Sequence, residues 1–197
     1  GASVILGEGL AYDRCSVGIV TNIVSDDEDL SRWDTQPTGG EYYTTPRSIY
    51  RTQVDVVLPS GHAVLNAEDE LVADFAELCD GEVIFFAVDP ANPTLLAHLA
   101  AGKRGVTVAD KRVVLRSGAD EIRLSRLVDT PYIGKAKQAK NIANVLAGIA
   151  AGWAMGLSKE VMTTGMKTFG LELADPASLI LQPATKSQPK KPAPARK

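Results

Sequence analysis

Short apolar runs flank a helical pattern in the first half of the chain. Residues 17–22, 62–66 and 82–88 are apolar and rich in β-branched side chains, which is typical of buried strands. Between the second and third runs, residues 67–79 repeat apolar side chains at helical spacing. A strand, a helix and a strand at these distances predict a βαβ unit, and therefore a parallel sheet that is covered on both faces.

The pattern changes in the second half. Residues 104–127 contain three short alternating stretches separated by turn residues, which predicts antiparallel strands joined by tight turns. Residues 139–157 and 158–169 then show helical apolar faces, with Ser158 placed to cap the second helix. Together these elements predict a three-layer α/β fold with a mostly parallel sheet and a small antiparallel edge.

Two segments carry no such pattern. Residues 31–50 are polar, contain Gly39-Gly40 and two prolines, and are expected to form a long loop or a lid. Residues 174–197 are rich in Pro, Lys and Ala and have no aromatic side chain, which predicts a disordered basic tail; a membrane-binding or nucleic-acid-binding arm is the alternative. We therefore place one domain at residues 1–173.

Composition narrows the class of protein. The chain has 197 residues, of which 45% are hydrophobic, enough for one full core. A net charge of −3 without a basic face argues against nucleic acid, and no apolar run approaches the length of a membrane span. The first residues do not form a signal peptide, and the chain resembles a piece of something longer. Cys15 and Cys79 lie far apart, which favours two buried thiols and a reducing cytoplasm over a disulfide framework.

Polar residues that close two of the predicted strands are the first candidates for a site. Ligands of open α/β sheets bind beyond the carboxyl ends of the strands, where Asn22 and Asn66 stand. Asn66 could cap the following helix or contact an adenine edge, and its position alone favours the cap. The acids of residues 26–29 could be a solvated loop or Mg²⁺ ligands, and without further information the loop is favoured.

The sequence gives no indication of a zinc site, a phosphate loop or a nucleophilic catalytic group. His62 and His98 have no Cys or His neighbour at zinc spacing. The chain contains no G-x-x-x-x-G-K-[ST] phosphate loop and no defensible Ser-His-Asp or Cys-His arrangement.

Three longer motifs resemble a known family. They are EGLAYDRCSVGIVTNI (residues 8–23), AVLNAEDELVADFAELCDG (residues 63–81) and NIANVLAGIAAGWAMGLSKEVMTTGMKTF (residues 141–169). In this order they resemble the Mur-ligase-like part of cyanophycin synthetases, over roughly residues 5–170. The first motif is specific to that family, whereas VLNAxD occurs across the wider Mur ligase superfamily.

The resemblance implies a Mur ligase central-domain fold and an activity. Cyanophycin synthetases are ATP-dependent carboxylate-amine ligases that use ATP and Mg²⁺ to build multi-L-arginyl-poly-L-aspartate. The implied partners are aspartate, arginine, the cyanophycin polymer and an upstream ATP-grasp region of the same enzyme, with no nucleic acid and no membrane. We expect a cytoplasmic homo-oligomer. In such a ligase, Mg²⁺ and basic groups must neutralise the charge that gathers on the phosphoryl group transferred from ATP.

The resemblance also implies roles for single residues. Asn66 matches the Asn that contacts adenine, which reverses the preference for a cap. Thr21 and Asn22 match the strand end that faces substrate and phosphate. Asn141 and Asn144 match an Asn pair in the late helix, where helix packing is an equal alternative.

Asp26 and Asp27 stand where the superfamily has Asp-His, with the His as a metal ligand, so Asp could replace His at Mg²⁺.

Departures from the family pattern favour a second hypothesis. The family's phosphate loop lies upstream of the matching region, and the chain begins after it. The basic residues of the family's element before GLAYDRC are absent here. The superfamily also has a lysine that helps to position metal and phosphate; its place falls near Tyr50-Arg51, where an arginine is not equivalent to a lysine. We therefore expect the chain alone to be inactive. A degenerate Mur-like module, kept for structure or assembly, is the alternative to a working ligase region.

Overall fold

A computed structural model describes residues 9–23, 46–134 and 139–169 of the chain. These residues form a six-stranded sheet in the order β1-β2-β3-β4-β5-β6. The strands are β1 (Cys15–Val20), β2 (Val57–Asn66), β3 (Glu82–Phe86), β4 (Arg104–Ala109), β5 (Arg112–Ser117) and β6 (Asp120–Arg126). The helices are α3 (Pro46–Asp55), α4 (Glu70–Ala73), η1 (Asp74–Leu78), α5 (Pro93–Ala100), η2 (Leu127–Asp129), α6 (Pro131–Gly134), α7 (Ala139–Ala154) and α8 (Lys159–Thr168).

The predicted pairing of the strands is confirmed. β1, β2, β3 and β4 are parallel neighbours, with Val64 of β2 opposite Ile84 of β3. β4, β5 and β6 are antiparallel neighbours. Asp110 and Lys111 join β4 to β5 with φ values of 48° and 61°, which is the positive-φ geometry of a two-residue hairpin turn. The small antiparallel edge therefore begins where β4 turns into β5.

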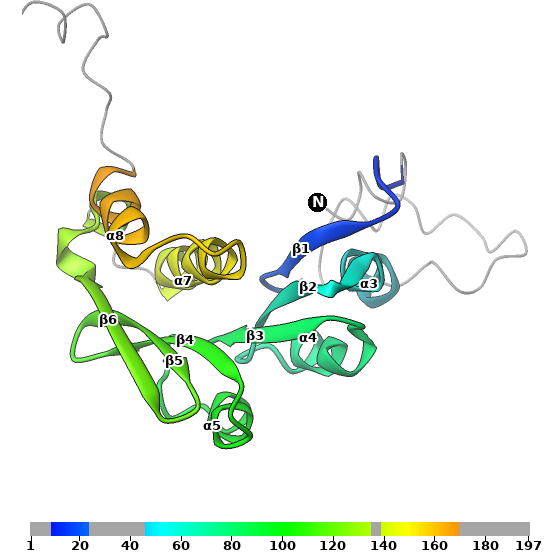
Figure 1. The fold of residues 1–197 in the computed structure, drawn as a ribbon, viewed down its shortest axis with the longest axis horizontal. Coiled ribbons are helices and arrows are strands. Elements are labelled where there is room, and N and C mark those ends of the chain that lie inside the picture. The colour runs from blue at the N-terminus through cyan, green and yellow to red at the C-terminus, as the bar shows by residue number, and fades with distance from the viewer. Residues whose placement is uncertain (1–8, 24–45, 135–138, 170–197) are drawn as a thin grey trace, which may run out of the picture.

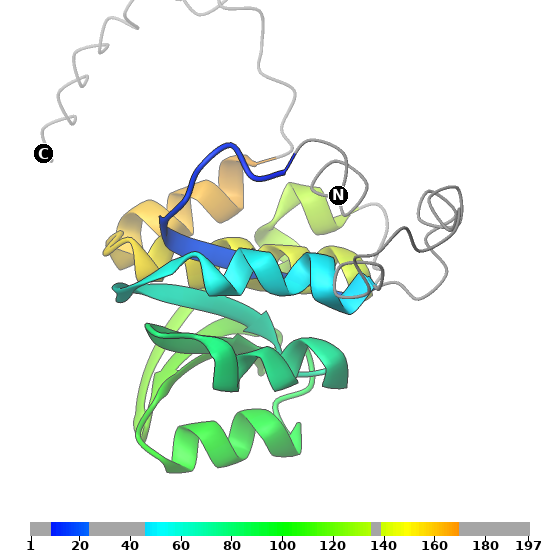
Figure 2. The ribbon, with the colours of Figure 1, turned by 90° about the vertical axis from the view of Figure 1, so that its right-hand side faces the viewer.

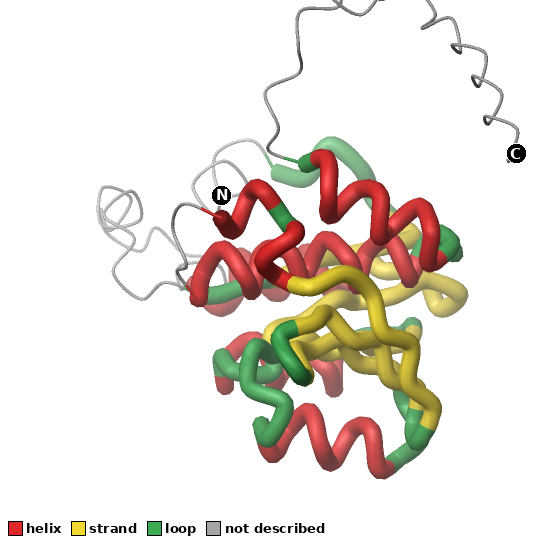
Figure 3. Tube along the Cα trace, turned by 90° about the vertical axis from the view of Figure 1, so that its left-hand side faces the viewer, coloured by secondary structure: helices red, strands yellow, loops and turns green. Residues whose placement is uncertain are grey.

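Helices cover both faces of the sheet, so the fold has three layers. Figure 1 shows α7 and α8 on one side of the strands and α5 on the other. The same layering is visible from the two perpendicular directions, with the strands between the helices (Figures 2 and 3). This arrangement explains why the parallel strands are apolar on both faces rather than alternating.

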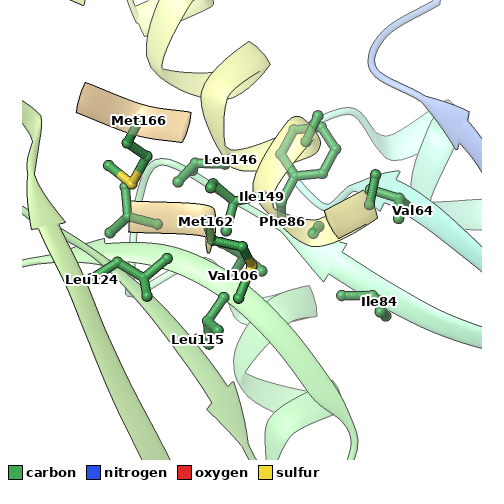
Figure 4. Close-up of a cluster of buried hydrophobic side chains, with 14 residues drawn as sticks. Val64, Ile84, Phe86, Val106, Leu115, Leu124, Leu146, Ile149, Met162 and Met166 are labelled. Carbon is green, nitrogen blue, oxygen red and sulfur yellow. The ribbon is translucent and has the colours of Figure 1, made fainter. Parts of the chain in front are cut away.

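The core beneath α7 and α8 draws on five strands, β2 to β6, and on both helices. Val64, Ile84 and Val106 face this side from the parallel strands and are fully buried. Met162 and Met166 of α8 point down onto the antiparallel strands, as the close-up shows (Figure 4). Unbranched methionine side chains suit the junction between a helix and a twisted hairpin, because they fill irregular gaps.

The core on the opposite face lies under α3, η1 and α5. Leu65 and Phe85 face it from the sheet, and Phe75 of η1 is fully buried there. Gly18 lets α3 lie directly on β1, since a Cβ at this position would collide with the backbone carbonyl of Gln53. This close approach fixes the helix against the strand.

Several predicted boundaries were wrong. β2 begins at Val57 instead of residue 62. Pro59 and Gly61 are residue types typical of turns, yet here they lie within an irregular part of the strand, where its register against β1 shifts. The helix predicted for residues 67–79 is a short α4 followed by the 3₁₀ helix η1, in which buried side chains can recur every three residues.

The predicted loop at residues 31–50 overlaps α3, which the sequence pattern did not indicate. The rest of that loop and the predicted tail at residues 174–197 lie outside the described residues.

Candidate functional site

The carboxyl ends of β1 and β2 are joined by the side chain of Asn66. Its Nδ2 donates to the backbone carbonyl of Thr21 at 2.9 Å, and its Oδ1 accepts from the backbone N–H of Glu68 at 2.9 Å. A side-chain amide has two hydrogens and two oxygen lone pairs. The half-buried Asn66 therefore keeps one hydrogen and one lone pair beyond these two bonds.

Asp69 caps the helix that follows β2. Its Oδ1 accepts from the backbone N–H groups of Leu71 and Val72 at 3.1 and 3.2 Å. Its Oδ2 accepts from the backbone N–H of Ile23 at 2.8 Å, which ties the chain after β1 to the start of α4. The position-based preference for Asn66 as the helix cap was therefore wrong: Asp69 has that role, since it directly precedes Glu70, the first residue of α4.

The hydrogen-bonded polar side chains at the carboxyl ends of β1 and β2 continue to the end of β3. Glu68 Oε1 accepts from the backbone N–H of Asp89 at 2.8 Å. Asn92 caps α5 through Leu95 N–H at 3.0 Å, and its Nδ2 donates to the carbonyl of Ala67 at 3.2 Å. We call this set the strand-end rim; its members are Thr21, Asn22, Asn66, Glu68, Asp69, Asp89 and Asn92.

The rim fits one part of a nucleotide better than another. Asn66 offers a spare donor and a spare acceptor, the pair that an adenine edge requires. Thr21 Oγ1 donates to Asn22 Oδ1 at 3.0 Å, so these two side chains lie together beside it. No lysine or arginine belongs to the rim as the described residues define it. The rim therefore suits a neutral base, and the phosphates would need cations from outside these residues.

The remaining predicted residues are Asp26, Asp27, Asn141 and Asn144. Asp26 and Asp27 lie outside the described residues, and the part of the chain that is described contains no group of three or more His, Cys, Asp or Glu side chains suited to a metal. Asn141 is half-buried on α7. Asn144 is exposed and lines a separate, largely apolar groove of ≈ 360 Å³ with Thr130 and Tyr132.

The amino ends of the strands carry a charged network that the sequence pattern did not indicate. Arg104 of β4 donates to both carboxylate oxygens of Glu82 on β3, at 2.7 and 2.8 Å. His62 of β2 lies 3.5 Å from the same carboxylate, and the Arg104 guanidinium lies 5.0 Å from the centre of the Trp153 ring on α7. The hydrogen bonds from Arg104 hold the pKa of Glu82 below its usual range. This network links three strands and one helix at the edge opposite the rim.

His98 and the two cysteines serve the fold. His98 Nε2 lies 3.0 Å from the Val83 carbonyl, and its ring packs edge-on against Phe85 with centroids 4.8 Å apart. Burial lowers the pKa of this imidazole. Cys15 and Cys79 are half-buried free thiols that are not joined in a disulfide. Burial raises the pKa of each thiol.

Comparisons with known proteins agree with the motifs. The chain is 33% identical over 165 residues to the cyanophycin synthetase of Synechocystis sp. and 31% identical over 165 residues to that of Crocosphaera subtropica. Each match covers 84% of this chain and 18% of the relative, so the chain spans less than a fifth of the length of these relatives. It is also 30% identical over 160 residues to the UDP-N-acetylmuramoylalanine–D-glutamate ligase of Desulfitobacterium hafniense, covering 79% of this chain and 29% of that ligase.

No family model matches the chain. Among the described residues, no helix is long and apolar enough to cross a bilayer. The mixed six-stranded sheet, with four parallel strands and an antiparallel hairpin edge, is consistent with a Mur ligase-like domain. The predicted family is confirmed: the chain is a relative of the cyanophycin synthetases, and it matches a stretch of them that also resembles a Mur ligase.

Proposed function

We propose that this chain is the Mur-ligase-like region of an ATP-dependent acid–amino-acid ligase of the cyanophycin synthetase type. The observation that carries the proposal is the strand-end rim, in which Asn66 joins two parallel strands at the edge where open α/β sheets bind ligands. The similarity to named synthetases and to a ligase supports the reaction class. The complete enzyme would form amide bonds in an Asp/Arg polymer, multi-L-arginyl-poly-L-aspartate.

In this proposal the rim holds the nucleotide by its base. The free Nδ2 hydrogen and the free Oδ1 lone pair of Asn66 would meet the adenine edge, and Thr21 and Asn22 would face the phosphates and substrate. ATP would supply the activated phosphoryl group that turns a carboxylate into an acyl phosphate. Mg²⁺ would be held by Asp26 and Asp27, as carboxylates are the ligands that this cation prefers.

The same proposal names the partners of the complete enzyme. They are aspartate, arginine, the growing cyanophycin polymer and an upstream ATP-grasp region of the same protein, in a cytoplasmic homo-oligomer. Asn141 and Asn144 would contribute to nucleotide or substrate contacts from α7. Because Asn144 lies in a groove whose lining contains no rim residue, its contribution would require a ligand that extends beyond the rim.

A degenerate structural or assembly module is the second candidate. It is favoured by how the rim uses its acids: Glu68, Asp69 and Asp89 all accept hydrogen bonds from backbone N–H groups. Carboxylates held in this way stabilise the fold whether or not a nucleotide binds. In that case the domain would support chemistry that takes place elsewhere in the enzyme.

Titration of a non-hydrolysable ATP analogue with Mg²⁺ into the complete enzyme separates the two candidates. Asn66→Asp should weaken binding by about 1–3 kcal/mol, because an ionised carboxylate cannot donate to adenine. Asp26→Asn and Asp27→Asn should raise the Mg²⁺ requirement, since an amide is a poorer ligand for a hard cation. Calorimetry at a temperature where every variant is folded is the measurement. Unchanged affinities in all three variants would leave the module without a nucleotide role.

The 197 residues by themselves contain no G-x-x-x-x-G-K-[ST] pattern. We therefore expect no phosphate release from this chain when ATP, aspartate, arginine and a polymer primer are supplied. Phosphate release clearly above a buffer blank would contradict this expectation.

A further inference from the structure

A basic pocket lies at the β6 edge of the domain, away from the strand-end rim. α8 packs over β6 there (Figure 1). Residues of both elements line a cavity of ≈ 290 Å³. The lining residues are Arg112, Arg123, Leu124, Ser125, Asp129, Lys159, Thr163 and Lys167. Four of these eight side chains are cationic and one is anionic, in a chain whose net charge is −3.

Two of the charged groups in the basic pocket are already neutralised. Arg123 donates to Asp110 at 2.9 Å and to Glu121 at 2.6 Å. The carboxylate of Asp129 accepts two hydrogen bonds from Arg126, each at 3.1 Å. The pocket's own acid is therefore occupied by a cation that does not line it.

The other three cations have no acidic partner in the described part of the chain. Arg112 donates to the backbone carbonyl of Leu124 at 3.1 Å, which fixes its guanidinium against β6, and it forms no ion pair with a described carboxylate. Lys159 and Lys167 of α8 form no ion pair with a described carboxylate. Three positive charges thus converge on one cavity from two elements.

The positive charges of the pocket act on its own acid, Asp129. Asp129 is held below its usual pKa chiefly by Arg126, and Lys167 and Arg112 lower its pKa further. Ser125 and Thr163 add hydroxyl groups to the same wall. The composition of the pocket is that of a site for an oxyanion such as a carboxylate or a phosphate.

The spacing of the cations selects an elongated ligand. Lys159, Thr163 and Lys167 recur every four residues and share one face of α8, so the two lysines lie about 12 Å apart along the helix axis. A ligand with several separated negative groups can therefore pair with more of these cations at once than a single phosphate can. An extended peptide presents side chains of one face roughly 6.6–6.8 Å apart, so its carboxylates can meet both lysines and Arg112.

We propose that the basic pocket formed by Arg112, Lys159 and Lys167 binds an extended acidic peptide segment through its side-chain carboxylates. Single-stranded nucleic acid is the other elongated polyanion, but it binds through aromatic stacking in addition to charge, and no aromatic side chain lines the pocket. The site does not depend on the nucleotide role proposed for the rim.

Fluorescence anisotropy with a short labelled oligo-aspartate peptide tests the site on the full 197-residue chain. Binding should be clear at about 50 mM NaCl and weaken strongly at about 200 mM, as expected for charge pairing at a surface. The double variant Lys159→Gln, Lys167→Gln should lose about five- to tenfold in affinity. Glutamine preserves helix propensity, and both lysines are exposed, so the variant should keep its fold.

Two control variants isolate the pocket. Lys103→Gln removes an exposed lysine that directly precedes β4 and does not line the pocket, and it should leave the affinity unchanged. The double variant Lys159→Arg, Lys167→Arg should retain binding, because the charges remain.

Four outcomes would overturn the proposal. They are no binding at low salt, equal loss of affinity in Lys103→Gln and in the double glutamine variant, equal competition by inorganic phosphate at the same concentration of charge, and tighter binding of a single-stranded oligonucleotide than of oligo-aspartate. The last outcome would identify a nucleic-acid site instead.

Discussion

Replacing Asn66 by aspartate is the sharpest test of how the rim is built. The change keeps the volume of the side chain and the oxygen that accepts from Glu68 N–H, but it replaces the Nδ2 that donates to the Thr21 carbonyl by an oxygen. Two acceptors then face each other across what was a 2.9 Å hydrogen bond. The new negative charge also stands next to the carboxylates of Glu68 and Asp69.

The expected cost follows from these contacts. Loss of the hydrogen bond to Thr21 is worth about 0.5–1.5 kcal/mol, and a carbonyl left without its partner raises the cost toward about 3 kcal/mol when water cannot replace the donor. Asn66 is half-buried, so partial access of water to Thr21 keeps the loss below that upper figure. We expect Asn66→Asp to lower the free energy of unfolding by about 2 kcal/mol.

Urea denaturation followed by circular dichroism measures this loss, and Asn22→Asp is the matched control. Asn22 is exposed, and among the described residues it uses only its Oδ1, as the acceptor for the Thr21 hydroxyl, so aspartate preserves this interaction while adding the same charge to the same rim. Its stability should stay within about 0.5 kcal/mol of the parent. Salt should recover the repulsive part of the Asn66→Asp loss, because added ions screen surface charge, and it should not recover the lost hydrogen bond.

Equal stability of Asn66→Asp and the parent chain would refute this reasoning. It would mean that the amide does not hold β1 against β2. A loss equal to that of Asn22→Asp would attribute the effect to charge alone. Either result would also simplify the nucleotide titration, because the binding loss could then be assigned to adenine without a contribution from the fold.

Three further changes test the framework around the rim. Arg104→Gln should lower the free energy of unfolding by about 1 kcal/mol, because it removes both bonds to the partly exposed Glu82; an unchanged urea midpoint would contradict this. Gly18→Ala should cost about 1–3 kcal/mol by pushing α3 from β1, whereas Gly148→Ala, with no atom near its added Cβ, should stabilise α7 by about 0.5–1 kcal/mol in the same assay. Because burial lowers the pKa of His98, the unfolded chain takes up this proton before the folded chain does when the pH is lowered below about 6.5. The free energy of unfolding should therefore decrease as the pH is lowered there, by at most about 1.4 kcal/mol per pH unit. A slope that is unchanged in His98→Gln would contradict this.

The sheet could be predicted because its strands must be apolar on both faces. A parallel strand that is covered by helices on each side reads as a continuous apolar run, and residues 17–22, 62–66 and 82–88 do so. The hairpin could be predicted because Asp110-Lys111 interrupts an alternating pattern with residues that accept a tight turn. Both signals are local, so they are present in a single sequence.

The misassigned elements lacked a local signal. α3 has few apolar residues, with Ile49 and Val54 buried among polar neighbours, and it begins with a proline in a segment with the composition of a loop. Its stability comes from packing on β1, where Gly18 permits the close approach. Pro59 and Gly61 hid the first half of β2 for the opposite reason, because turn residues there occupy an irregular strand.

The apolar runs predicted that Asn22 and Asn66 stand at the carboxyl ends of neighbouring strands, but they did not predict the hydrogen bonds among the rim residues. Asn66 and Asp69 are three residues apart, and both residue types cap helices well. What separates their roles is the chain beyond β1: Thr21 offers a carbonyl to Asn66, and Ile23 offers an N–H to Asp69. These partners lie 45 and 46 residues away in the sequence, so propensity near residue 66 could not distinguish the two.

Charge is divided between two edges of this domain in a way that bears on any ligand. The acids of the strand-end rim each accept hydrogen bonds from backbone N–H groups, close to where the proposal puts the nucleotide. A triphosphate would be repelled by them unless cations intervene, which makes Mg²⁺ or basic side chains beyond the described residues a physical requirement of the nucleotide role. Arg112, Lys159 and Lys167, which form no ion pair with a described carboxylate, lie in the basic pocket at the β6 edge instead, with no rim residue in its lining. A nucleotide base at the rim and an acidic chain at β6 would therefore use opposite electrostatic features of one sheet, and neither site could replace the other.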